Sequence, residues 1–323
     1  MNIDEKIDID KPLWDQSTYI GRLKHFAFIT DFRMIFESKK RLREAKQFCD
    51  DYKMGKIPSG TQMSDIIRAK QLRDGAFHPD TGELIHSFSR LSFQMPASAV
   101  LTASMLAFQK NTPVTVTLQI LHQLHIAIIN YTYRSRLNNN DKTTIRNTIL
   151  CAAITSSIVT VYCKKILFRR FILQRYLPFC AMTTSHILNL PIIRYKEITT
   201  GIPLFMKDEK NPFMKSKVAA IKGVYECLIT RIVMSIPCLI FVPLLTHKFL
   251  ANYFFQRRSW ILIPIETCLC ALGCLFAIPS ALAIFPERNS MSTELMKLYP
   301  SEYEDFKKCV KEHVDKVYYN KGL

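Results

Sequence analysis

One apolar stretch of this sequence carries a polar face that is suited to bind a small molecule. Positions at offsets of 0, 3, 4, 7 and 11 fall on one side of an α-helix, and here they are Gln119, His122, Gln123, Ile126 and Asn130. Their amide groups both donate and accept hydrogen bonds, so they could hold the ammonium and carboxylate of a zwitterion. Such amides also hold membrane helices to one another, and the spacing leaves both interpretations open.

The histidines and cysteines do not predict a metal site or a cofactor. His122 and His125 form an H-x-x-H pair, which could ligate a metal. No carboxylate or thiolate lies in register with the pair, so packing or contact with a substrate is the favoured interpretation. The ten cysteines contain no C-x-x-C pair, which argues against a disulfide framework. Cys268, Cys270 and Cys274 would not share one helical face.

A second candidate region closes another apolar stretch at Asn189-Leu190-Pro191. Pro191 would free a backbone carbonyl near the membrane surface, and Arg194 and Glu197 follow just beyond it. The alternative is a plain helix end with an arginine that reaches the headgroups. Glu266 is the only acidic residue in the last apolar stretch, and a carboxylate inside a membrane is a functional candidate.

Long stretches with at most one charge each place these candidates in a membrane. A helix that crosses a bilayer needs about 20 predominantly apolar residues. Basic residues lie beside most ends of the stretches, among them Lys164, Arg194 and Arg231. The sequence therefore predicts an all-α, polytopic membrane protein with about five membrane helices. The stretches are Met95–Asn130, Asn147–Cys163, Tyr176–Ile193, Ile232–Thr246 and Ser259–Pro286.

The first stretch leaves a sixth membrane helix open. Met95–Asn130 is long for one span and contains Lys110, Asn111 and Pro113 near its centre. Proline has no N–H for a continuous helix, so the stretch is either one kinked helix or two segments. The distribution of lysine and arginine does not decide the orientation, because the connection between Arg194 and Arg231 also contains acidic residues.

Composition divides the chain into three regions and restricts its partners. Hydrophobic residues make up 48% of the 323 residues, yet the mean hydropathy is only +0.04. We expect a soluble helical region at 1–94, a transmembrane domain at 95–286 and a soluble tail at 287–323. The formal net charge of +17 lies largely between apolar stretches, which favours membrane lipids as partners and not nucleic acid. The first residues lack the features of a signal peptide or a cleavable mitochondrial presequence.

Two local patterns organise the N-terminal region. Lys39–Tyr52 has apolar residues at helical spacing, which predicts an amphipathic helix. His78-Pro79-Asp80-Thr81-Gly82-Glu83 predicts a turn, because proline fixes φ, Asp80 can bond to the backbone and Gly82 tolerates a positive φ. We expect this turn (His78, Pro79, Asp80, Thr81, Gly82) to be structural or gating and not to bind substrate.

Six motifs in order make the chain resemble the sideroflexins of the mitochondrial inner membrane. His78–Glu83 matches the HPDTGE signature of that family, and Asn130-Tyr131-Thr132 with Arg134 resembles NYTNR. Asn189-Leu190-Pro191 with Arg194 and Glu197 resembles NIPLMRxxEL. The other three are Trp14–Arg22, Phe285-Pro286 and Tyr319–Leu323, which resemble the opening motif, FPQ and YFNKGL.

The chain departs from the family pattern at polar positions. Where the family has NQSxNA, this sequence reads His122-Gln123-Leu124-His125-Ile126-Ala127. Two amides and a hydroxyl are therefore lost. Tyr133 replaces the second asparagine of NYTNR. If these positions contact substrate, specificity or activity is altered in this member.

The resemblance implies a carrier of small neutral amino acids, notably serine, that supplies mitochondrial one-carbon metabolism. Alternating access around a site near the midplane would be the mechanism. Gln123, Asn130 and Asn189 would bind the polar ends of the substrate, with Arg194 near the path of the carboxylate. The alternative is a non-transporting scaffold in iron, haem and iron–sulfur homeostasis. We do not expect an enzyme, because the sequence has no nucleophile–base pair or phosphate-binding loop.

Overall fold

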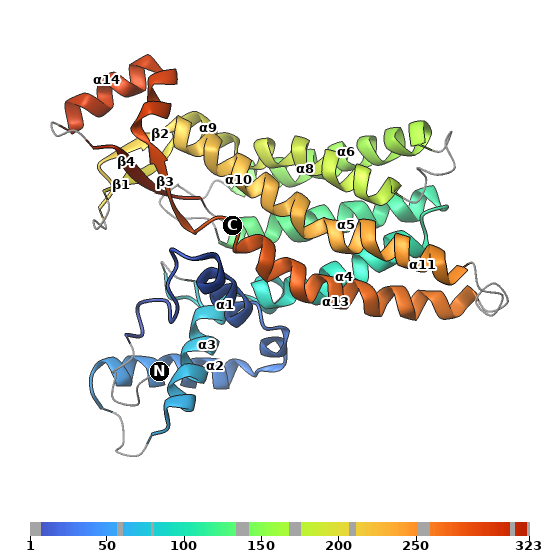
Figure 1. The fold of residues 1–323 in the computed structure, drawn as a ribbon, viewed down its shortest axis with the longest axis horizontal. Coiled ribbons are helices and arrows are strands. Elements are labelled where there is room, and N and C mark those ends of the chain that lie inside the picture. Colours follow the sequence, from blue (N-terminus) through green and yellow to red (C-terminus); the bar gives the residue numbers. More distant parts are fainter. Residues whose placement is uncertain are drawn as a thin grey trace.

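The computed structural model describes residues 8–56, 61–78, 81–133, 142–167, 176–206, 211–250, 259–310 and 314–321. It shows a small helical region, a long helical bundle and a strand-containing part (Figure 1). The helical region precedes the bundle in the chain and comprises α1 (Tyr19–Ile29), η1 (Phe32–Phe36), α2 (Lys39–Lys53), α3 (Met63–Ala76) and η2 (Ser87–Ser89).

Helix α2 confirms the predicted amphipathic helix almost to the residue. Ser38 precedes it, and its side chain accepts a hydrogen bond from the backbone N–H of Arg41, at 3.2 Å. Such a cap satisfies one of the N–H groups left over at a helix start. The buried face of α2 packs against α3 in a separate small core that includes Leu42, Cys49 and Leu72.

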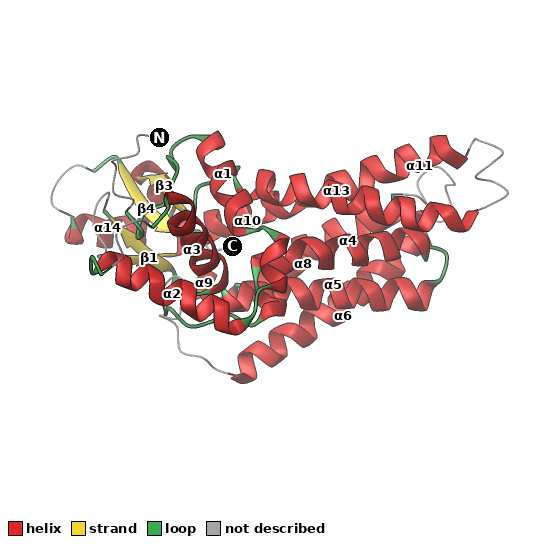
Figure 2. Cartoon of the chain, turned by 90° about the horizontal axis from the view of Figure 1, so that it is seen from below, coloured by secondary structure: helices red, strands yellow, loops and turns green. Residues whose placement is uncertain are grey.

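Six helical segments form the described bundle, in which α6 packs against α5 and α8, and α13 against α4 and α10. Figure 2 shows them running side by side along its length. The segments are α4 (Leu91–Ala107), α5 (Thr112–Thr132), α6 (Lys142–Leu167), α8 (Leu177–Ile193), the run of α10 (Lys217–Ile236), η3 (Pro237–Phe241) and α11 (Val242–Leu250), and α13 (Leu262–Leu282) after the short η4 (Ser259–Ile261).

The stretch Met95–Asn130 is divided between two of these helices. Lys110 and Asn111 lie in the turn between α4 and α5, and the Asn111 side chain accepts a hydrogen bond from Val114 N at 3.4 Å. Pro113 lies in the first turn of α5, where a missing N–H costs nothing. This division favours the alternative of six segments.

Arg231 lies inside a helix and not at the end of one. The connection that the sequence suggested between Arg194 and Arg231 is folded, because it contains α9 (Tyr195–Thr200), β1 (Ile202–Phe205), β2 (Met214–Ser216) and most of α10. The helix then continues through a π-helical turn at Pro237–Phe241. A proline cannot supply an N–H to the regular ladder, and a π-turn is one way to accommodate that loss.

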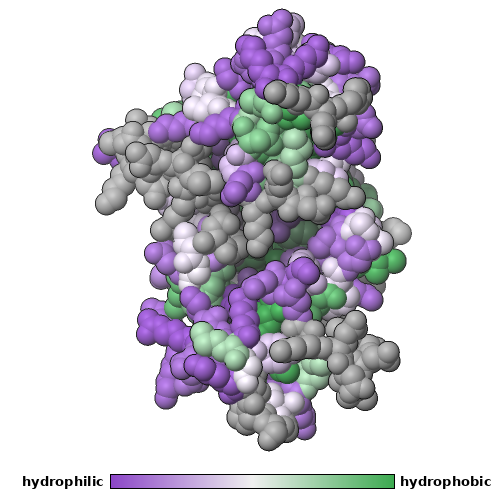
Figure 3. All heavy atoms as spheres, turned by 90° about the vertical axis from the view of Figure 1, so that its left-hand side faces the viewer, coloured by the Kyte–Doolittle hydropathy of each residue, from purple (hydrophilic) through white to green (hydrophobic). Residues whose placement is uncertain are grey.

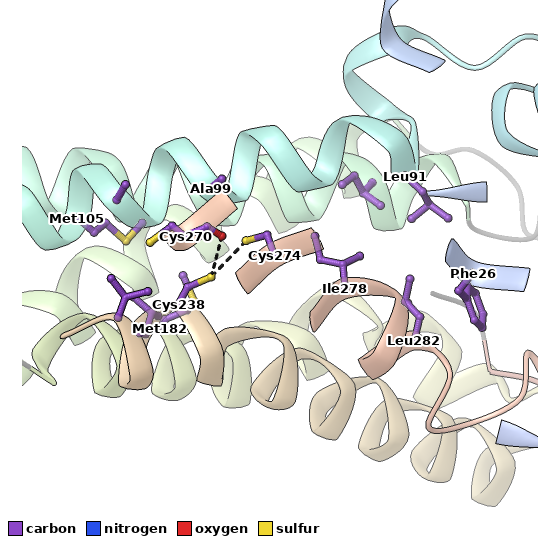
Figure 4. Packing of buried hydrophobic residues seen from close by; sticks show 14 of the residues in the cluster. Phe26, Leu91, Ala99, Met105, Met182, Cys238, Cys270, Cys274, Ile278 and Leu282 are labelled. Atoms are coloured by element: carbon purple, nitrogen blue, oxygen red, sulfur yellow. Dashed lines mark hydrogen bonds between the residues drawn. The ribbon is translucent and has the colours of Figure 1, made fainter. Parts of the chain in front are cut away.

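The bundle has the length and surface of a membrane domain. Within the described parts of the chain, three helices are long and apolar enough to cross a membrane, namely Thr112–Thr132, Lys217–His247 and Leu262–Leu282. Two apolar helices, α4 and α8, are shorter. Large apolar side chains such as Ile158 and Phe276 are exposed on its outside, as expected for a surface in lipid. Inside, apolar residues of α4 and α13 interdigitate (Figure 4).

A four-stranded antiparallel sheet corrects the expectation of an all-α fold. Its order is β2-β1-β4-β3, with β3 (Arg288–Ser292) and β4 (Lys316–Asn320) from the C-terminal region. Leu204 of β1 pairs with Tyr319 of β4. Strands β3 and β4, which belong to the region expected to be a soluble tail, thus form one sheet with β1 and β2. That region also contains η5 (Thr293–Leu298) and α14 (Pro300–Cys309).

The N-terminal helices and the sheet lie at the same end of the bundle (Figure 1). Arg22 of α1 donates from Nε to the carbonyl of Ala283, just after α13, at 2.8 Å. The Lys321 ammonium, after β4, donates to the carbonyl of Phe285, at 2.8 Å. Figure 3 looks onto this end, where hydrophilic residues cover much of the described surface.

Candidate functional site

The polar face of α5 points into the bundle, as its spacing predicted. Gln119, His122 and Gln123 are 1%, 4% and 2% exposed, and Ile126 on the same face is also buried. The Nε2 atoms of Gln119 and Gln123 and Nδ1 of His122 are buried without a hydrogen-bond partner among the described residues. A buried polar atom without a partner costs about 1–3 kcal/mol, so this face is incomplete by itself.

Two small adjoining cavities lie next to this face, inside the bundle. Both are lined by Gln94, Ile126, Arg231 and Met234. The first reaches toward the end of the bundle that carries the sheet, where Lys321 lines it. The second lies among five of the six segments of the described bundle. It is lined in addition by Ser98, Thr102, His122, Met182, His186, Ser235, Cys238, Cys274 and Ile278.

Arg231 is the cation shared by the two cavities. It is half-buried, and its guanidinium donates from Nη2 to Oδ1 of Asn130 on α5. Its Nε is buried and has no partner among the residues that the structure describes. The described ion pairs include none to Arg231. A positive charge therefore lies at both cavities without an ion pair among the described residues.

Two histidines from different helices lie at the second cavity. The ring centroids of His122 on α5 and His186 on α8 are 6.1 Å apart, with the rings tilted by 55°. His125 is turned away and packs edge-on against Phe93, at 5.7 Å. The H-x-x-H pair thus points in two directions, and the described residues contain no group of three or more potential metal ligands.

The predicted substrate residues are only partly brought together. Asn130 holds Arg231, and Gln123 is buried on the same face, although it lines neither cavity. Asn189 donates from Nδ2 to Oγ of Ser156 at 3.1 Å and so joins α8 to α6. Hydrogen bonds of this kind hold membrane helices to one another.

Arg194 lines neither cavity and is bound by Glu197 and Cys227. Its Nε donates to Oε2 of Glu197 at 2.6 Å, and its Nη1 lies 3.2 Å from Sγ of Cys227. Arg194 is the C-cap residue of α8 and lines neither cavity, whereas Cys227 lines the first. The geometry gives Arg194 the position of a brace between α8, α9 and α10.

The predicted turn at His78–Glu83 lies in the N-terminal region, against α2. The His78 N–H donates to the Glu83 carbonyl, and the Gly82 N–H donates to the His78 carbonyl, both at 2.9 Å. Gly82 has φ +64°, the left-handed conformation that the sequence predicted. The Lys46 ammonium donates to the Gly82 carbonyl at 2.7 Å. Pro79 and Asp80 of this motif lie outside the described residues, as does Arg134.

The cysteines of α13 divide as helical geometry predicted. Cys268 is exposed, whereas Cys270 and Cys274 are buried, and all three are free thiols. Sγ of Cys238 on η3 lies 3.3 Å from Sγ of Cys274 and 3.4 Å from the carbonyl of Cys270 (Figure 4). Within the apolar core, these groups pack as small hydrophobic side chains.

Comparisons with known proteins identify the family. A family model described as sideroflexins matches residues 8–323. The chain belongs to the sideroflexin family. Sideroflexin-2 of Drosophila melanogaster is 35% identical over 321 residues, Sideroflexin-3 of Rattus norvegicus 34% over 322, and Sideroflexin-1 of Ovis aries 32% over 321. Each alignment covers 98% of both chains. No solved structure matches the chain.

In this sideroflexin, Gln94 and Arg231 line both cavities, and the sequence predicted neither of them as a site residue. Arg231 was read as a flanking charge, because the uncharged stretch begins right after it. One signal could have corrected this: between Lys217 and Ile236, a run without proline predicts one continuous helix. On such a helix Arg231 shares a face with Cys227 and Met234.

Proposed function

We propose that this sideroflexin is a transporter of small neutral amino acids, in particular serine, in the mitochondrial inner membrane. It would supply mitochondrial one-carbon metabolism. Family membership supports a transporter-type role, and the apolar bundle supports a membrane location. The bundle would cross the membrane with its six segments, so that the N-terminal helices and the sheet face the same compartment.

The observation that carries this proposal is the pair of cavities around Arg231. They combine apolar walls with a few polar groups, which is the usual make-up of a site for a small ligand. Buried polar atoms around them lack partners in the described chain, and a polar substrate could supply those partners. The cavities lie where helices of the bundle meet, as midplane sites of transporters do.

Uptake into liposomes tests the proposal. Purified protein should take up labelled serine faster than protein-free vesicles, and unlabelled alanine should compete better than aspartate. Gln94→Leu, which removes a polar cavity wall, should reduce uptake. Thr267→Val, on α13 and away from both cavities, is the matched control.

A negative result would favour the second candidate function. Protein that is folded and inserted, but takes up none of these amino acids, would argue for a non-transporting scaffold in iron, haem and iron–sulfur homeostasis. One observation supports keeping that candidate: Ile126, which replaces a polar residue of the family pattern, lines both cavities.

A further inference from the structure

Arg231 places a positive charge inside the bundle without a described ion pair. A charged side chain within a membrane domain is costly and is normally paired or faces a water-filled cavity. The one hydrogen bond of Arg231 that the structure describes goes to a neutral amide, Asn130. That bond orients the guanidinium without neutralising it.

The carboxylates near this site already have partners of their own. Glu197 is held by Arg194. Glu226, on the same helix as Arg231, accepts at Oε1 from Tyr319 at 2.9 Å and from Asn289 at 2.7 Å, on the side of the sheet. Neither carboxylate is described in contact with Arg231. The counter-charge is therefore expected from a ligand.

We propose that Arg231 anchors the carboxylate of a small α-amino acid, with Asn130 as the residue that positions it. Guanidinium groups suit carboxylates because their N–H donors match the two oxygens. The Nε of Arg231 and the Nδ2 of Asn130 are both buried and without a described partner. A carboxylate accepts hydrogen bonds only and would satisfy both donors.

The two histidines complete recognition of a zwitterion. His122 and His186 line the second cavity together with Arg231. A neutral imidazole has one nitrogen that accepts a hydrogen bond, and Nδ1 of His122 has no described partner. An ammonium group could donate to this nitrogen while the carboxylate contacts Arg231. The remaining small polar walls, Ser98, Thr102 and Ser235, fit a short hydroxylated side chain.

A series of ligands that differ by one charged group tests this inference, which rests on the proposed function. Binding is measured by calorimetry on the purified full chain in nanodiscs. Serine should bind at least about tenfold more tightly than ethanolamine, which lacks the carboxylate, a difference of about 1.4 kcal/mol. Glycerate, which keeps the carboxylate and replaces the ammonium by a hydroxyl, should lie between them. Equal affinity for serine and ethanolamine in the wild-type protein, or no binding of any carboxylate, would overturn the proposal.

The decisive variant is Arg231→Gln. It should abolish the preference for serine over ethanolamine, and Arg231→Lys should restore part of it. The matched control is the double change Arg194→Gln with Glu197→Gln, which removes a buried arginine together with the carboxylate that pairs with it. This control should keep the preference. If folded Arg231→Gln protein still prefers serine over ethanolamine, Arg231 does not bind the carboxylate.

The binding series separates this proposal from the proposed function. If the wild-type protein binds serine through Arg231 but does not transport it, the anchor stands and transport fails. If serine is transported and Arg231→Gln protein transports it equally well, transport stands and the anchor fails.

Discussion

At the scale of single residues, Asn130 combines two roles that the sequence left open, contact between helices and a place next to a binding site. Its Oδ1 accepts from Arg231 on another helix, so it holds helices together, and the residue that it holds lines the cavities. The inward face of α5 was predictable because helical periodicity is local. The partner of Asn130 was not, because Arg231 comes to it through the fold of the whole bundle.

Asn130→Ala should leave an inserted protein that transports serine at least about tenfold more slowly, the scale of one lost hydrogen bond at about 1.4 kcal/mol. Asn130→Asp should also transport poorly, for another reason: the new carboxylate would neutralise Arg231 in place of the substrate. Tyr131→Phe, on the exposed side of α5, is the control. Normal uptake by folded Asn130→Ala protein would restrict Asn130 to helix packing.

Restoring family residues at Ile126 and Leu124 tests whether the departures from the family pattern reduce transport. Ile126→Asn together with Leu124→Ser restores polar groups of the family and should leave serine uptake unchanged or raise it. Uptake that appears only in this double variant would show that the wild-type protein has moved toward a scaffold role. A loss of uptake would mean that the apolar wall at Ile126 is itself required.

Substitution of Gly82 should change the stability of the protein and not its transport activity. The φ of +64° at this residue is strained for a β-branched residue, at a cost of about 1–3 kcal/mol. A Cβ at Gly82 would also lie 3.2 Å from the Lys46 ammonium. Gly82→Val should therefore reduce the amount of folded protein. Gly82→Asn should be milder, because asparagine tolerates this conformation. Normal accumulation of the valine variant with an altered affinity for serine would place this turn in the binding site.

At the scale of elements, one buried carboxylate on α10 accepts hydrogen bonds from the sheet. Glu226 accepts from Tyr319 of β4 and from Asn289 of β3, and both Glu226 and Tyr319 are buried. Burial raises the pKa of the Tyr319 hydroxyl well above its usual range, and the nearby Glu226 carboxylate raises it further. The hydroxyl therefore remains a donor at physiological pH.

Tyr319→Phe should lower the free energy of unfolding by about 1.5–3 kcal/mol, the range for a hydrogen bond to a charged group. The pH dependence has a fixed sign, because the folded pKa of Tyr319 is raised. Its stabilising contribution is complete below the unfolded pKa of about 10 and decreases as pH rises above it. Thermal unfolding of wild-type and variant protein between neutral and alkaline pH measures this. A difference between them that does not shrink at alkaline pH would contradict the assignment.

At the scale of the whole molecule, the apolar helices were predictable and the sheet was not. Length and lack of charge identify a membrane helix locally, and Lys110 with Pro113 even indicated where α4 and α5 separate. The strands are only three to five residues long, and β1 finds β4 across the intervening helices of the bundle. Segments this short show too little alternation of apolar and polar residues to predict a strand, and the sequence does not indicate their distant partners.

The arrangement of the bundle predicts that the two terminal regions face the same compartment. Single cysteines at Met54→Cys, at native Cys309 and at Lys110→Cys report on the N-terminal helices, on α14 and on the turn between α4 and α5. In mitochondria with the outer membrane opened, a membrane-impermeant maleimide should label the first two alike. Lys110→Cys should show the opposite accessibility. Opposite labelling of Met54→Cys and Cys309 would instead require an odd number of crossings.

Because β1 pairs with β4, the sheet cannot be completed until the C-terminal region has been synthesised. When β1 leaves the ribosome, only the short β2 follows at once, and the other edge of β1 has no neighbour. The helices α10, α11 and α13 must all be synthesised before β4. Throughout this interval an open strand edge is exposed, which is a site for wrong pairing. A chain that ends before β4 therefore keeps this edge of β1 open, so that closure of the sheet distinguishes the complete protein from an incomplete one.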